Sequence, residues 1–167
     1  MYGNKDICLA LGMQLETPIE KQPALLKNAG FTAFAFDKLK NSDSVLTEKL
    51  IRAGEKQGLR CEYIHAPFYG MDDIWHDESG ELADIMLKDL YATIDECQAF
   101  DVKYAVIHAI IGMDNHNPTQ LGLERLDALA NLANDMRPSR FLRGKRPVLG
   151  VLVVPTPIVG NDMLVSP

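Results

Sequence analysis

The sequence lacks the motifs that mark the commonest nucleotide and zinc sites. Neither G-x-G-x-x-G nor G-x-x-x-x-G-K-[ST] follows any apolar run, which excludes the usual phosphate-binding loops of open α/β sheets. No C-x-x-C pair occurs, which argues against a zinc knuckle. The three cysteines, Cys8, Cys61 and Cys97, are widely separated, and we expect them to be buried, reduced thiols of an intracellular protein.

Long apolar runs and an excess of basic charge are also missing. Residues 1–6 are polar and carry no signal-peptide core, and the apolar run 148–154 is too short to span a bilayer. The formal net charge of -6 argues against a surface that coats nucleic acid. With 167 residues, of which 47% are apolar, the chain is long enough for one core. We therefore expect a cytoplasmic protein with neither a membrane nor a nucleic acid as partner.

Apolar runs and amphipathic stretches alternate strictly through most of the chain. The runs 7–11, 31–36, 59–64 and 103–107 are typical of buried strands, and the stretches 20–29, 45–57, 81–100 and 119–133 are typical of helices. This alternation predicts a parallel sheet with helices outside it. Half of a (β/α)8 barrel and an open doubly wound sheet both fit the pattern, and the missing nucleotide motifs favour the barrel.

The third and fourth predicted strands each end in a histidine, His65 and His108. Parallel strands joined by a crossover helix end at the same edge of a sheet, and α/β proteins bind ligands at that edge. We therefore predict that the two imidazoles lie side by side, where they can ligate a divalent metal or contact a substrate. For either histidine alone, a hydrogen-bonded structural role is the simpler interpretation.

The connection 68–80 is long for a compact α/β unit and contains several aromatic and acidic residues. Such loops are usually functional. Trp75 is expected to anchor this loop over the core, although its place near the strand ends leaves a sugar-stacking role open. His76 and His116 are predicted to be surface residues.

The alternation stops near residue 136. A basic run, which we interpret as a solvated linker, is followed by the apolar run 148–154, a candidate fifth strand; the basic residues are Arg137, Arg140, Arg143, Lys145 and Arg146. We divide the chain into a barrel half, 1–136, and an atypical tail, 137–167. A complete barrel takes about 250 residues, so we expect an incomplete (β/α)8 TIM barrel of about four β/α units.

Three segments together resemble the sugar phosphate isomerase/epimerase group with the xylose isomerase-like barrel: His65-Ala66-Pro67-Phe68, Ile74-Trp75 and Ala105-Val106-Ile107-His108. The endonuclease IV type of abasic-site nuclease belongs to the same superfamily. The resemblance covers about residues 5–134, the N-terminal half of such a barrel. It implies a (β/α)8 barrel, often with a divalent metal (Mn, Mg, Zn or Co) at its C-terminal rim. It also implies isomerisation or epimerisation of a sugar or sugar phosphate.

Carried over to this chain, the resemblance makes His65 and His108 candidate metal ligands, and His65, Trp75 and His108 candidate substrate-binding residues. Glu16 and Asp37, near the ends of the first two strands, match less well. No catalytic residue is assigned. The expected function is metal-assisted proton transfer on a carbohydrate, with a homodimer as one way to complete the site. The alternatives are a non-catalytic half-barrel binding module and, more distantly, an abasic-site nuclease.

Overall fold

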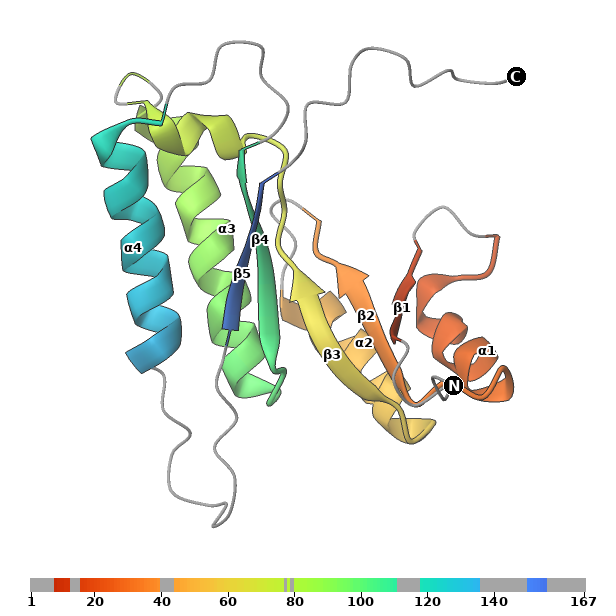
Figure 1. The fold of residues 1–167 in the computed structure, drawn as a ribbon. Helices are drawn as coiled ribbons and strands as arrows, with labels where there is room; N and C mark the ends of the chain where they lie inside the picture. Colours follow the sequence, from red (N-terminus) through yellow and green to blue (C-terminus); the bar gives the residue numbers. More distant parts are fainter. Residues whose placement is uncertain are drawn as a thin grey trace.

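Five parallel strands form one sheet. The computed structural model describes residues 8–12, 16–39, 44–76, 78, 80–110, 118–135 and 150–155. The strands are β1 (Cys8–Leu11), β2 (Ala33–Asp37), β3 (Arg60–His65), β4 (Tyr104–Ile110) and β5 (Gly150–Pro155). They lie in the order β1-β2-β3-β4-β5, and every neighbouring pair is parallel (Figure 1).

Helices connect the successive strands. They are α1 (Gln22–Asn28), α2 (Ser44–Lys56), α3 (Gly80–Ala99) and α4 (Gln120–Asp135), with short 3-10 helices η2 (Ile19–Lys21) and η3 (Met71–Trp75). The stripe that α3 buries repeats every three or four residues, as an amphipathic helix on a sheet requires; it contains Ala83, Met86, Leu90, Ile94 and Cys97. All four predicted β/α units are therefore present.

The strand order decides between the two folds that the sequence allows. An open doubly wound sheet needs a reversal of strand order, because only then do right-handed crossovers place helices on both faces. Here the order is sequential throughout, so right-handed crossovers place all the helices on one face. The architecture is therefore an incomplete (β/α)8 barrel, and the expected fold class is confirmed.

The core lies between the sheet and its helices. On β2, Phe34 and Phe36 stack with ring centroids 6.4 Å apart, and both are buried. Gly54 lets α2 approach this pair closely, because a Cβ at this position would lie 2.2 Å from Cε1 of Phe34. Ile64 of β3 and Ile107 of β4 are also fully buried. Each such side chain contributes about 1.5 to 3 kcal/mol by leaving water.

The apolar run near the C-terminus adds a fifth strand to the same sheet, since β5 pairs with β4 over six residue pairs. Residues 136–149 and 156–167 lie outside the described residues, and so do the predicted basic linker and His116. The predicted domain boundary after residue 136 therefore stays a prediction. Among the described residues, no helix combines the length and the apolar character that crossing a membrane requires.

Candidate functional site

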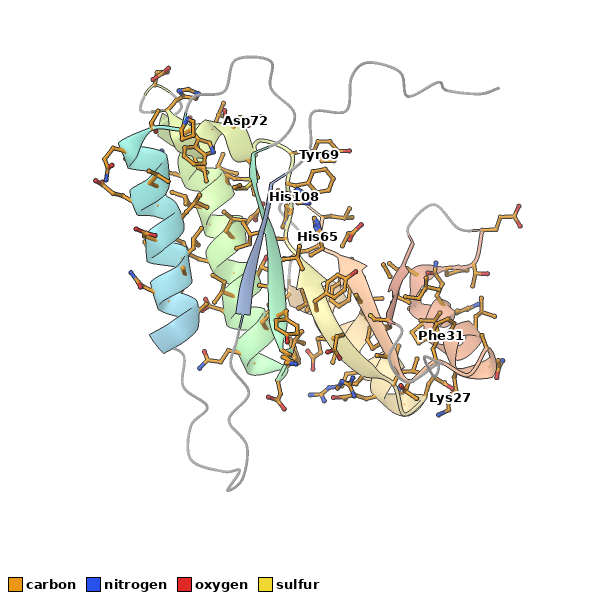
Figure 2. All side chains as sticks on the ribbon, viewed as in Figure 1. Lys27, Phe31, His65, Tyr69, Asp72 and His108 are labelled. Carbon is orange, nitrogen blue, oxygen red and sulfur yellow. The ribbon has the colours of Figure 1, made fainter. Side chains whose placement is uncertain are left out.

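The imidazoles of His65 and His108 meet at the C-terminal ends of β3 and β4. Their Nε2 atoms are 2.9 Å apart and their ring centroids 4.9 Å apart. Both side chains are partly exposed. Figure 2 shows the pair towards the end of the sheet opposite to Phe31 and Lys27. The predicted convergence of the two histidines, which lie 43 residues apart in the chain, is therefore what the fold produces.

The hydrogen bonds assign a tautomer to each ring of the neutral pair. Nδ1 of His65 lies 2.9 Å from the carbonyl oxygen of Ala66, and a carbonyl only accepts, so this nitrogen carries the proton and donates. Nε2 of a neutral His65 then has no proton and accepts a hydrogen bond from the Nε2–H of His108. The pair is therefore directional, with His108 as donor and the basic nitrogen of His65 turned towards it.

Two effects lower the pKa of His108 below its ordinary value of 6.5. Burial of the ring is the larger, and the positive charge of a protonated His65 is the second. The carboxylate of Asp37 opposes both and raises the pKa. Asp37 ends β2, and its Cα is paired in register with that of His65. Asp37 therefore shares the rim with the two histidines, whereas Glu16 is an exposed residue of the segment leading into η2.

The histidine pair fits part of a divalent metal site. Two imidazole nitrogens each about 2.05 Å from one metal are about 2.9 to 3.4 Å apart at angles of 90° to 110°, and the Nε2 atoms are 2.9 Å apart. A ligating histidine usually donates its other N–H to a carbonyl, as His65 does to Ala66. To ligate the same ion, His108 would have to carry its proton on Nδ1 in place of Nε2. However, no three His, Cys, Asp or Glu side chains gather for a metal within the described ranges, and a catalytic site takes about three.

A buried charge pair supports the rim from the helix layer, and the sequence analysis missed it. Nζ of Lys38 lies 2.7 Å from Oε1 of Glu96 on α3, and their side chains are 2% and 9% exposed. The hydroxyl of Thr47 on α2 donates to the other carboxylate oxygen at 2.8 Å. The backbone N–H of Lys38 donates to the carbonyl oxygen of His65 at 2.8 Å. Lys38 therefore connects β2, β3 and α3 just behind the histidines.

Trp75 is buried under the rim and is only 3% exposed. Its indole N–H donates to the carbonyl oxygen of Ala109 at 2.8 Å, which fixes η3 to the end of β4. The ring packs on Gly122 of α4, and Arg125 of the same helix donates to the carbonyl oxygen of Ile74 at 2.7 Å. Trp75 thus anchors the loop in this structure, and its predicted contact with a substrate stays a prediction.

The cysteines take no part in the rim. Cys61 and Cys97 are buried, as expected, whereas Cys8 is partly exposed, and all three are free thiols. Burial raises the pKa of the Cys97 thiol to about 12 and that of Cys8 to about 11. Both thiols are therefore uncharged and weakly nucleophilic near neutral pH.

Comparison with solved structures finds similar folds among proteins of low sequence identity. The chain superposes on a D-psicose 3-epimerase, solved in the presence of D-fructose, with a TM-score of 0.57 and 10% identity over 77% of this chain and 48% of that one. With an L-ribulose 3-epimerase the TM-score is 0.55, and the identity is 19% over 78% of this chain and 45% of that one. With an AP endonuclease of family 2 from Brucella melitensis the TM-score is 0.53, and the identity is 14% over 75% of this chain and 49% of that one.

The chain therefore shares a fold with part of each of these three structures. The chain spans about half the length of each of these structures. At such low identity the likeness shows the fold alone. No protein-family model and no curated protein matches the sequence.

Proposed function

We propose that the chain is an isomerase- or epimerase-like half of a barrel that binds a small sugar or sugar phosphate at His65 and His108. The observation that carries the proposal is the 2.9 Å contact of two partly exposed imidazoles at the C-terminal rim. Ligands of (β/α)8 barrels bind at this rim. Two of the structures that share the fold are sugar 3-epimerases, which supports a carbohydrate as the substrate class.

The chemistry of the pair suits the stabilising part of a proton-transfer reaction. Moving a proton at a carbon next to a carbonyl needs a base, an acid and stabilisation of the enediolate that forms between the two transfers. The lowered pKa of His108 favours its neutral imidazole, which is the form that ligates a metal. A divalent metal held by His65 and His108, with further donors, would supply the stabilising charge. A second copy of the chain is one source of those donors.

Metal binding tests the proposal most directly. Titration of the purified protein with Mn²⁺ or Co²⁺, followed by calorimetry, is expected to show binding that His65→Ala and His108→Ala each weaken at least about tenfold. His76→Ala is the matched control, because this histidine is not part of the pair. Its Nδ1 lies 3.7 Å from Oε1 of Glu78 in the loop. Equal metal affinity in the parent and both pair variants would contradict the ligand assignment.

Turnover is tested separately by hydrogen exchange. D-fructose, D-psicose and L-ribulose are incubated with the protein and Mn²⁺ in D₂O, and deuterium at the carbon next to the carbonyl is followed by NMR. Epimerisation through an enediolate incorporates deuterium from solvent. Metal and sugar binding without any exchange would favour the alternative function, a non-catalytic binding module.

A further inference from the structure

Two aromatic side chains extend the histidine pair along the rim. The ring centroid of Phe68 is 5.5 Å from that of His65 and 5.5 Å from that of His108. The Tyr69 ring follows at 4.5 Å from Phe68 and is tilted by 30° to it. Figure 2 places Tyr69 with the two histidines at this end of the sheet. The four rings form one continuous surface that starts at the imidazoles.

The backbone turns Tyr69 outwards at this point. Gly70 has φ 93°, a left-handed conformation that favours glycine, and the N–H of Met71 donates to the carbonyl oxygen of Phe68 at 3.1 Å. The turn buries the Met71 side chain completely, while Tyr69 remains 73% exposed. Among the exposed large apolar side chains of the described residues, Tyr69 is the most exposed. The exposed Tyr69 ring, in contact with Phe68, therefore places apolar ring area next to the polar pair.

We propose that Phe68 and Tyr69 form an aromatic subsite for the C–H face of a sugar, next to the imidazoles that take its oxygens. This inference rests on the proposed function and deepens it. The face of an aromatic ring carries partial negative charge and attracts the slightly positive C–H groups on one side of a sugar. Polar groups at one end and an aromatic wall beside them are the usual composition of a small-molecule site.

Saturation-transfer NMR with D-fructose, D-psicose and L-ribulose as probes tests the subsite. The parent protein is expected to transfer saturation most strongly to the carbon-bound protons of the sugar. Tyr69→Ala is expected to raise the apparent Kd about fivefold or more, whereas Tyr69→Phe, which keeps the ring, stays within about twofold. Leu25→Ala removes another large exposed apolar side chain, 52% exposed on α1, and is the control that leaves binding unchanged.

The possible results separate this inference from the proposed function. Weaker binding by Tyr69→Ala with retention by Tyr69→Phe supports the subsite. Parent-like binding by Tyr69→Ala overturns the subsite alone when His108→Ala loses binding. Equal loss in Tyr69→Ala and Tyr69→Phe overturns it too, because the hydroxyl and not the ring would then hold the sugar. Absence of binding of all three sugars to the parent overturns both proposals. Thermal unfolding of each variant, followed by circular dichroism, verifies that it is folded.

Discussion

The loop that follows β3, residues 68–80, contains two short aromatic segments, of which one is exposed and the other is buried. Before Gly70, Phe68 contacts both histidines, and Tyr69 contacts Phe68 and is 73% exposed. After Gly70, η3 carries Trp75, which is 3% exposed and hydrogen-bonded to β4. The difference teaches that an aromatic ring of such a loop is available to a ligand only when no neighbouring helix covers it. The same residue class serves as an anchor when a neighbouring helix covers it.

Loss of the anchor is expected to have the largest effect. Trp75→Ala removes a buried ring and the indole hydrogen bond to Ala109, so the free energy of unfolding should fall by about 3 to 5 kcal/mol. Urea denaturation measures this change. Leu123→Ala, at a 47% exposed position of α4, is the control and should change stability by less than about 0.5 kcal/mol. A similarly small loss in Trp75→Ala would remove the distinction between the two segments.

A substitution at Gly122 of α4 should disturb the packing of Trp75 less than removal of the ring does. In Gly122→Ala the new Cβ would lie 2.1 Å from Cε3 of Trp75, so the ring or α4 must move. Overpacking of this kind costs about 1 to 3 kcal/mol, and the gain in helix propensity is about 1 kcal/mol. Because a separation of 2.1 Å forces a shift, we place the cost in the upper part of that range. We expect net destabilisation in urea. Asn131→Ala, at an exposed position of the same helix, should instead be neutral or stabilising.

The contribution of His108 to the stability of the fold should depend weakly on pH. The folded chain lowers the pKa of His108 below 6.5, mainly by burial, so the unfolded chain binds more protons between the two values. This contribution to stability is complete above pH 6.5 and is lost as the pH falls through the folded-state pKa. NMR titration of the His108 ring measures the shift. In His65→Gln, which lacks the second positive charge, the pKa of His108 should rise; a further fall would contradict the assigned cause.

Tyr69→Ala should have the smallest effect on folding. Its side chain is mostly exposed, so the free energy of unfolding should change by less than about 0.5 kcal/mol, even though we expect sugar binding to weaken. Urea denaturation of this variant beside Trp75→Ala compares the two segments directly. A loss above about 1 kcal/mol would show that Tyr69, too, is part of the anchor.

The sequence predicted the features that depend on local pattern and on parallel topology. Apolar runs and helix periods identified four β/α units, and the direction of the strands brought His65 and His108 together. Strand order itself could not be derived, because a barrel and a doubly wound sheet use the same local pattern. The roles of the two histidines as ligands remain predictions.

Features that depend on long-range packing escaped the sequence analysis. Lys38 and Glu96 are 58 residues apart, and neither stands in a pattern that indicates a buried pair. Periodicity also gave no means to tell which aromatic of the loop is covered, since Trp75 is covered by Gly122 of a later helix. A glycine on the inner face of a predicted helix is the one sign that a large ring packs against it.

The buried Lys38–Glu96 pair has a consequence for the spacing of the two imidazoles. The chain between His65 and His108 runs through α3, and Glu96 fixes this helix to the residue that follows β2. Because the N–H of Lys38 also donates to the carbonyl oxygen of His65, the ion pair connects α3 to the strand end that carries this imidazole. We expect a substitution in α3 that moves Glu96 to alter the distance between the two imidazoles without touching either of them.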